Sequence, residues 1–168
     1  PAIGAGGRGA AQVNRASNLP DNIESYLVHP LIAAREYSID LLMDLTGQRA
    51  VQAVVRERLQ IVSGESKVST VVQHPALAAA TMQLGAQLGL VGHNTVQAFD
   101  DAERGIMFIE VNPRFGGASN CSIIAGLDSP DRILAMLADD PSAFETRPVR
   151  YGLTMLRYSQ DVFVEAAP

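Results

Sequence analysis

The sequence predicts an α+β fold built on antiparallel sheet, and two patterns carry this prediction. Predicted strands follow one another as hairpins, joined by short polar turns at 44–47 and 101–105. Predicted helices do not alternate regularly with the strands, as they do around a parallel sheet. The 168 residues are 47% apolar and 18% charged, so one sizeable core can form and a second independent domain is not expected.

The first half of the chain is expected to contribute three strands and one helix. Residues 23–28 form a short strand, and residues 35–44 and 50–58 form a hairpin around an Asp-Leu-Thr-Gly turn. Residues 75–88 are expected to form a helix, because a proline stands in its first turn, leucines recur at helical spacing and a glycine follows.

The second half is expected to contribute four strands and two helices. The strands are predicted at 95–99, 106–111, 150–158 and 162–165, and the helices at 119–125 and 130–137. Gly126 is placed to end the first of these helices, and Ser129 is placed to cap the second.

Composition and charge exclude several classes of protein. There are 13 basic residues against 18 acidic ones, a net charge of −5, and no basic run offers a nucleic-acid surface. The longest stretch without a charged residue, 68–99, is interrupted by polar residues and glycines, so no membrane span is predicted. The single cysteine, Cys121, excludes a disulfide scaffold. No secretory signal pattern is present, and a soluble, cytoplasmic protein is expected.

A glycine cluster at 4–9, with the letters G-A-G-G-R-G, is the first candidate for a binding site. Glycines allow backbone N–H groups to converge on phosphate oxygens. The letters also match the G-x-G-x-x-G pattern of nicotinamide-dependent oxidoreductases, which requires a strand before it and a helix after it. Pro20 shortens the segment that follows, so a phosphate flap between two strands fits better, with a flexible linker as the alternative.

A second candidate lies at the end of the strand 106–111. If the preceding hairpin pairs Asp101 with Ile106, Gln97 stands directly opposite Glu110 and diagonal to Asn112. One carboxylate and two amide oxygens then share one face, which suits a hard divalent cation such as magnesium. A three-residue loop with a bulge alters this register, and a strand that simply ends before a proline turn is the alternative.

Charged residues of the first hairpin form further candidates. Glu36, Ser38 and Asp40 alternate with Tyr37 and Ile39, so they share one face of their strand, and taken alone a solvated strand face is the favoured explanation. The nearby basic residues are Arg56, Arg58 and Lys67. These cations are suited to phosphate or to a substrate carboxylate, and ordinary surface charge is the alternative.

The order of these motifs resembles the ATP-grasp superfamily, in particular the branch related to the large chain of carbamoyl-phosphate synthase. The most specific motifs are E-Y-S-I-D at 36–40 and E-V-N-P-R-F-G-G at 110–117. The resemblance covers residues 1–164 and implies antiparallel sheets with flanking helices. It identifies residues 1–168 as the C-terminal portion of an ATP-grasp domain, with a flap and hinge over 1–30 and a metal- and nucleotide-binding subdomain over 31–168.

The resemblance assigns seven positions to ATP. They are Gly6, Gly7, Arg8, Glu24, Leu27, Glu36 and Lys67. The backbone of the first three is expected to cover the β- and γ-phosphates, and the next two match the hinge that binds adenine. The carboxylate of Glu36 matches the group that binds the ribose hydroxyls. Lys67, like Arg58, matches a phosphate-side cation loosely.

The same resemblance implies the metal ligands and the reaction. Gln97, Glu110 and Asn112 match the positions that bind magnesium, or manganese in its place, and Arg114 matches a catalytic arginine. The expected activity joins a small-molecule carboxylate to an amine or ammonia through an acyl phosphate. A non-catalytic structural or interaction domain derived from a ligase is the alternative, and the oligomeric state is left open, a homodimer included.

The resemblance also implies that the family module is incomplete at the N-terminus of this chain. In the family, a Lys-Pro strand end precedes the glycine loop, and this sequence begins at Pro1. The lysine of that strand end contacts the nucleotide phosphates. We therefore expect residues 1–168 alone to be inactive or nearly so.

Overall fold

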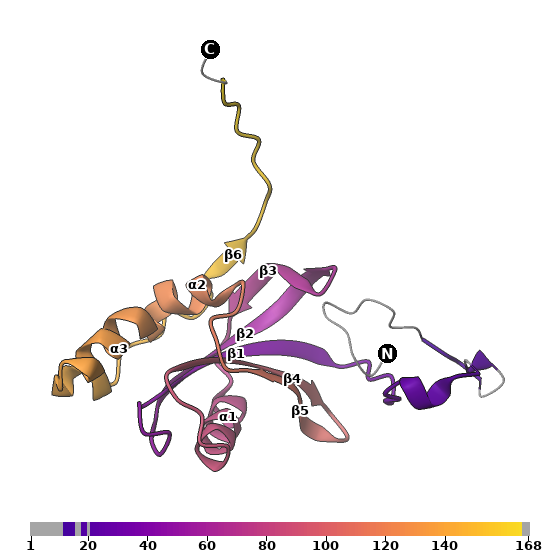
Figure 1. Cartoon of the computed structure of the whole chain (residues 1–168), viewed down its shortest axis with the longest axis horizontal. Helices are drawn as coiled ribbons and strands as arrows, with labels where there is room; N and C mark the ends of the chain where they lie inside the picture. The colour runs from indigo at the N-terminus through magenta and orange to yellow at the C-terminus, as the bar shows by residue number, and fades with distance from the viewer. Residues whose placement is uncertain (1–11, 16–17, 20, 166–168) are drawn as a thin grey trace.

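All strands that the computed structural model describes form one six-stranded antiparallel sheet in the order β5-β4-β1-β2-β3-β6 (Figure 1). The structure describes residues 12–15, 18–19 and 21–165. The strands are β1 (Arg35–Met43), β2 (Ala50–Val62), β3 (Glu65–Val71), β4 (His93–Asp101), β5 (Gly105–Asn112) and β6 (Thr154–Leu156). The predicted α+β class with antiparallel sheet is confirmed.

Helices and short turns complete the fold. They are α1 (Pro75–Gln87), α2 (Ser119–Ser122), α3 (Ser129–Leu137), the 3-10 turns η2 (Ile23–Ser25) and η4 (Pro141–Phe144), and the π turn η3 (Ile123–Leu127). Among the described residues, no helix has the length and apolar character that crossing a membrane requires.

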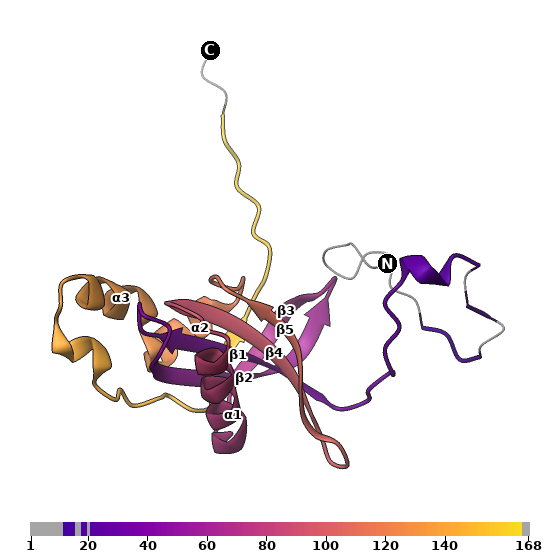
Figure 2. The same cartoon turned by 60° about the horizontal axis from the view of Figure 1, so that its bottom comes forward.

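Helix α1 covers one face of the sheet (Figure 2). Its buried Leu77 belongs to an apolar cluster with Ile39 of β1, Val55 of β2 and Val96 of β4. Gly85 is needed for this packing, because a Cβ atom there would lie 2.5 Å from Cδ2 of Leu41. The predicted helix over 75–88 is confirmed.

The opposite face divides into a covered half and an uncovered half. Alternation places Leu42, Val54 and Val71 on this face, where Cys121 and Leu127 of the α2–η3 segment pack against them. Toward the first residues of β1, the same face carries polar side chains in place of this apolar cluster. The uncovered half contains the candidate site.

Three of the predicted strands differ from the structure. Residues 23–28 contain the 3-10 turn η2 and no strand, and residues 162–165 are extended without a strand partner among the described residues (Figure 1). The predicted strand over 150–158 shortens to β6. In each case residues with a high strand propensity were present, but no neighbouring strand among the described residues supplies the hydrogen bonds along the full segment.

The sequence prediction missed β3 altogether. This strand pairs with β2 on one side and with β6 on the other. Its residues 65–70 are mostly polar, so they lack the apolar alternation that marks a half-buried strand. The Ser63-Gly64 turn before it has both φ angles positive, at 52° and 78°, as a two-residue hairpin requires.

Gly126 ends the helical segment that starts at Ser119, as predicted, but Ser129 does not cap α3. Gly126 has a φ of 120°, and the Oγ atom of Ser129 lies 2.8 Å from Nδ1 of His93. Asp128, in a left-handed conformation, occupies the N-cap position of α3 without a side-chain cap. The cap prediction for Ser129 is therefore wrong, because a tertiary hydrogen bond uses the hydroxyl.

Replacing Gly126 with alanine is expected to lower the free energy of unfolding by more than about 1 kcal/mol. A Cβ atom at Gly126 would lie 2.3 Å from the carbonyl oxygen of Pro148, in addition to the strain of the positive φ. Chemical denaturation measures the loss. Gly152→Ala is the control, because its φ is also positive, at 81°, and a Cβ atom there meets nothing within 4 Å. Equal losses in both variants would contradict a role for the contact with Pro148.

Candidate active site

The β4–β5 hairpin has a shorter loop than the sequence suggested. Asp101 pairs with Gly105, which leaves three residues in the loop, and Ile106 pairs with Asp100. The expected pairing of Asp101 with Ile106 is therefore wrong. Asp101 fixes the turn, because its Oδ1 atom accepts hydrogen bonds from the backbone N–H groups of Glu103 and Arg104, at 3.1 and 2.9 Å.

A bulge in β5 restores the predicted register at the candidate site. Ala98 of β4 pairs with Phe108, and the residue before it, Gln97, pairs with Glu110. Ile109 is therefore the extra residue of the bulge. The bulge shifts the pairing by one position and so compensates for the shorter loop, and the expectation that a three-residue loop with a bulge alters this register is therefore wrong. The predicted pairing of Gln97 with Glu110 is confirmed.

Four strands contribute polar side chains to one row across the uncovered face. Gln97 of β4 donates from Nε2 to Oε2 of Glu110 on β5, at 2.9 Å. Its Oε1 atom accepts from Nη1 of Arg58 on β2, also at 2.9 Å. Arg58 forms an ion pair with Glu36 of β1 and donates from Nη2 to the carbonyl oxygen of Gly64, at 2.7 Å. We call Glu36, Arg58, Gln97 and Glu110 the polar row.

Asn112 and Arg114 extend the polar row at the end of β5. Asn112 pairs with Thr95, two residues before Gln97 on β4, so its side chain shares the face of Glu110. Arg114 donates from Nη2 to Oδ1 of Asn112, at 3.2 Å, and from Nη1 to the carbonyl oxygen of Phe115, at 3.1 Å. The three predicted metal positions thus lie on one face of two neighbouring strands.

The structure does not bring the remaining predicted positions to this row. Lys67 of β3 pairs with Glu65, at 3.0 Å. Glu24 and Leu27 are exposed and lie before β1, in the N-terminal segment that runs away from the sheet in both views (Figures 1 and 2). Gly6, Gly7 and Arg8 lie outside the described residues.

The side-chain oxygen atoms of Gln97, Glu110 and Asn112 suit a hard divalent cation. Magnesium takes oxygen ligands and keeps several waters, so one carboxylate and two amide oxygens are a sufficient protein contribution. In this structure Oε1 of Gln97 accepts from Arg58, so ligation by Gln97 requires its amide to turn this atom toward Glu110. Within the described residues, no group of three His, Cys, Asp or Glu side chains could hold a metal.

Sequence reasoning missed a buried ionic cluster next to the polar row. Asp40 and Arg56 are almost fully inaccessible, and Nη2 of Arg56 lies 2.7 Å from Oδ2 of Asp40. The same oxygen accepts from the hydroxyl of Ser122, at 2.5 Å. A solvated strand face for Asp40 and surface charge for Arg56 are therefore wrong. The run of apolar residues directly after Asp40 was the available signal of burial.

The environment of Asp40 keeps its carboxylate ionised. Burial by itself would raise the pKa of Asp40, but the charge of Arg56 and hydrogen bonds from His93, Ser119 and Ser122 lower this pKa well below its usual range. A carboxylate that stays charged inside the fold can act only as a hydrogen-bond acceptor.

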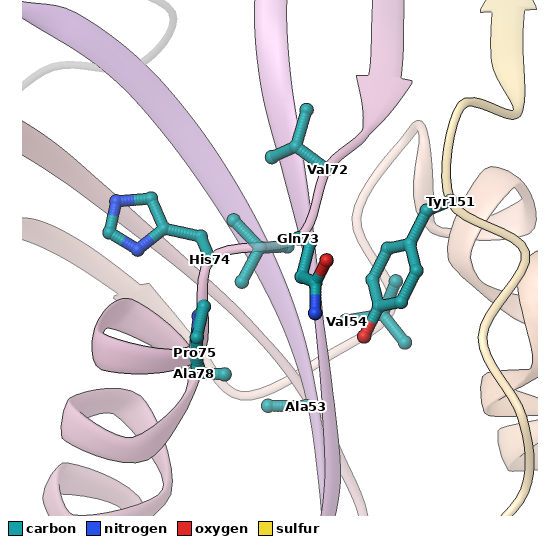
Figure 3. A pocket seen from close by; sticks show the side chains of 9 residues that line it. Ala53, Val54, Val72, Gln73, His74, Pro75, Ala78 and Tyr151 are labelled. Carbon is teal, nitrogen blue, oxygen red and sulfur yellow. The ribbon is translucent and has the colours of Figure 1, made fainter.

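A small pocket lies elsewhere, beside the start of α1 (Figure 3). Its volume is about 70 Å³, and its lining includes Val55, Gln73, His74 and Tyr151. Figure 3 shows the side chains of Gln73 and Tyr151 next to each other, with the His74 ring turned away from them. None of the predicted site residues lines this pocket.

Three solved structures with a similar fold carry carboxylase names. The chain is similar to urea carboxylase of Kluyveromyces lactis, with 22% identity and a TM-score of 0.56 over 71% of this chain and 12% of that one. It is similar to pyruvate carboxylase of Rhizobium etli, with 21% identity and a TM-score of 0.56 over 70% and 13%. A single-chain, multi-domain long-chain acyl-CoA carboxylase shows 24% identity and a TM-score of 0.53 over 64% and 12%.

These similarities concern the fold, and the chain spans about an eighth of the length of each of these structures. A comparison with curated proteins gives no match. A family model described as "ATP-grasp in the biosynthetic pathway with Ter operon" matches residues 22–160, which is well over half of the sequence. The chain therefore belongs to this ATP-grasp family.

Proposed function

We propose that this chain is part of an ATP-dependent ligase that joins a small-molecule carboxylate to an amine or ammonia through an acyl phosphate. One observation carries the proposal: the polar row, Asn112 and Arg114 lie together on an uncovered sheet face. Membership of an ATP-grasp family supports the use of ATP. The carboxylase names of the structural neighbours support chemistry on a carboxylate.

In the proposed complex, Gln97, Glu110 and Asn112 hold magnesium, or manganese in its place. A bound ion supplies charge neutralisation to the phosphates of ATP. Glu110 contributes the only formal negative charge of these three side chains, so it determines most of the electrostatic attraction. Glu36, which Arg58 holds at the other end of the polar row, is proposed to bind the ribose hydroxyls.

Arg114 is the proposed catalytic residue. Its guanidinium is exposed and is held through Asn112, so it can donate to the phosphoryl group during transfer. The rest of the proposed nucleotide site follows from the family resemblance. The backbone of Gly6, Gly7 and Arg8 is proposed to cover the phosphates. Glu24 and Leu27 are proposed to form the hinge that binds adenine, and Lys67 is the loosely matched phosphate-side cation.

The proposal is tested by product analysis with the full-length protein. Incubation with ATP and magnesium is expected to release ADP only when a suitable carboxylate is present. Hydroxylamine is expected to trap the acyl phosphate as a hydroxamate, which mass spectrometry identifies together with the carboxylate. Absence of magnesium-dependent ATP binding would instead support a non-catalytic domain derived from a ligase.

Replacing Arg114 with alanine is expected to lower kcat for ADP release by about 100-fold, with a smaller change in KM for ATP. The reason is that Arg114 stabilises charge that develops during transfer. Arg104→Ala is the matched control, because Arg104 is also exposed and belongs to the loop of the same hairpin. Steady-state kinetics of both variants make the comparison. An unchanged kcat in Arg114→Ala contradicts the catalytic role.

A further inference from the structure

The chain turns sharply after β5, and two buried hydroxyl groups accept a hydrogen bond from the backbone of this turn. The backbone N–H of Gly116 points to Oγ1 of Thr95, at 3.0 Å, and to Oγ of Ser119, at 2.8 Å. Oγ1 of Thr95 also lies 3.3 Å from the carbonyl oxygen of Arg114, but its single proton is directed to the nearer Asp40, at 2.9 Å. The backbone N–H of Gly116, directly after Phe115, is thus held by two buried hydroxyls.

Asp40 determines which way these hydroxyl groups point. Its Oδ1 atom accepts from Ser119, at 2.5 Å, and from Thr95, at 2.9 Å. Because the ionised carboxylate has no proton to give, both hydroxyls must donate to it. Their lone pairs are then left to accept the N–H of Gly116. The buried charge therefore gives these hydrogen bonds a single direction.

Close packing leaves the turn little freedom around these bonds. A Cβ atom at Gly116 would lie 2.8 Å from Oγ1 of Thr95 and 3.0 Å from its Cγ2. The ring of Phe115 stacks on the ring of His93, with centroids 4.1 Å apart and an interplanar angle of 14°. Nε2 of His93 in turn lies 3.3 Å from Oδ1 of Asp40. Two residues of the turn are therefore connected to Asp40. Phe115 is connected through His93, and Gly116 is connected through Thr95 and Ser119.

We infer that Asp40 is a positioning residue for Arg114, acting through Thr95 and Ser119, an inference that rests on the proposed function. No hydrogen bond or ion pair among the described residues joins Asp40 to the polar row; Asp40 fixes the turn that directly follows Arg114. Displacement of a catalytic group by about 1 Å can reduce a rate by about 100-fold, so a fixed backbone at this point affects kcat.

The test compares Thr95→Val with Thr95→Ser in the full-length protein. Valine keeps the shape of threonine but removes the hydroxyl, whereas serine keeps the hydroxyl. We expect Thr95→Val to lower kcat about tenfold with KM for ATP unchanged within twofold, and Thr95→Ser to recover most of the loss. Thr70→Val on β3 is the control for loss of a strand threonine hydroxyl away from the turn.

Amide hydrogen exchange gives a readout that does not depend on catalysis. Protection of the Gly116 N–H is expected in the wild type and in Thr95→Ser, and is expected to fall only in part in Thr95→Val, because Oγ of Ser119 remains as an acceptor. It is expected to be lost in the double variant Thr95→Val/Ser119→Ala. Retained protection in the double variant would overturn the positioning role alone. The positioning role would also be overturned if Thr95→Val had the wild-type kcat while Arg114→Ala was impaired. Equal losses of kcat in Thr95→Val and Thr95→Ser would overturn it as well. An unimpaired Arg114→Ala would overturn the proposed function itself.

Discussion

Replacing Glu110 with glutamine is expected to lower the rate of ATP-dependent ligation by about 100- to 1,000-fold, which corresponds to about 3–4 kcal/mol of transition-state stabilisation. The substitution removes the only formal charge of the three proposed metal ligands and nearly preserves the shape of the side chain. Steady-state kinetics at several magnesium concentrations measure the effect. We expect saturation by magnesium to shift to higher concentrations.

Glu103→Gln is the matched control for this change of charge. Glu103 is exposed and stands in the loop of the same hairpin, and the hydrogen bond from its backbone to Asp101 does not involve its side chain. Its kinetics and its magnesium dependence are expected to equal those of the wild type. If Glu110→Gln also behaves as the wild type while Arg114→Ala is impaired, the metal lies elsewhere.

Replacing Asp40 with asparagine is expected to lower the free energy of unfolding at pH 7 by about 3–5 kcal/mol. The substitution leaves Arg56, which is 1% exposed, as an uncompensated buried charge. Chemical denaturation monitored by circular dichroism measures the loss. Asp139→Asn is the control, because Asp139 is exposed and has a φ of 55°, a conformation that asparagine also tolerates. A loss below about 1 kcal/mol would contradict the ionic role of Asp40.

The pH dependence of stability has a definite sign. The pKa of Asp40 is lower in the folded chain than its usual value of 3.8. Its contribution is therefore fully present above about pH 4 and is lost as the pH falls toward the folded-state pKa. The free energy of unfolding of the wild type should decline below pH 4, and the slope of this decline should be smaller in Asp40→Asn.

Local signals in the sequence were sufficient to predict strands β1 and β4 and helix α1. Strands β1 and β4 combine apolar residues with a turn at their ends, and α1 has a proline at its start and a glycine after it. The pairing of Gln97 with Glu110 was predicted from a four-residue loop that the structure does not have, and it holds because the bulge at Ile109 compensates for the shorter loop. Alternation and turn residues thus identified the two partner strands, but they did not determine the loop length or the bulge.

Features that depend on distant parts of the chain were not predictable in this way. Strand β3 has a polar sequence, and its pairing partners on β2 and β6 decide its conformation. The burial of Asp40 depends on Ser119 and Ser122, which are about 80 residues away in sequence. An acidic residue on a strand has the same local pattern whether its face meets water or a helix.

The bulge at Ile109 gives the β4–β5 hairpin an unusual response to insertions and deletions. A strand has a side-chain period of two, so a change of one residue in length turns every following side chain to the other face. Deleting Ile109 would remove the bulge and leave Glu110 directly opposite Gln97, so Glu110 and Asn112 would keep their phase. An insertion of one residue between Gly105 and Ile109 has no such reserve and would turn these two side chains to the other face. Length variants of β5 in related sequences should therefore be single-residue deletions in this stretch and not single-residue insertions.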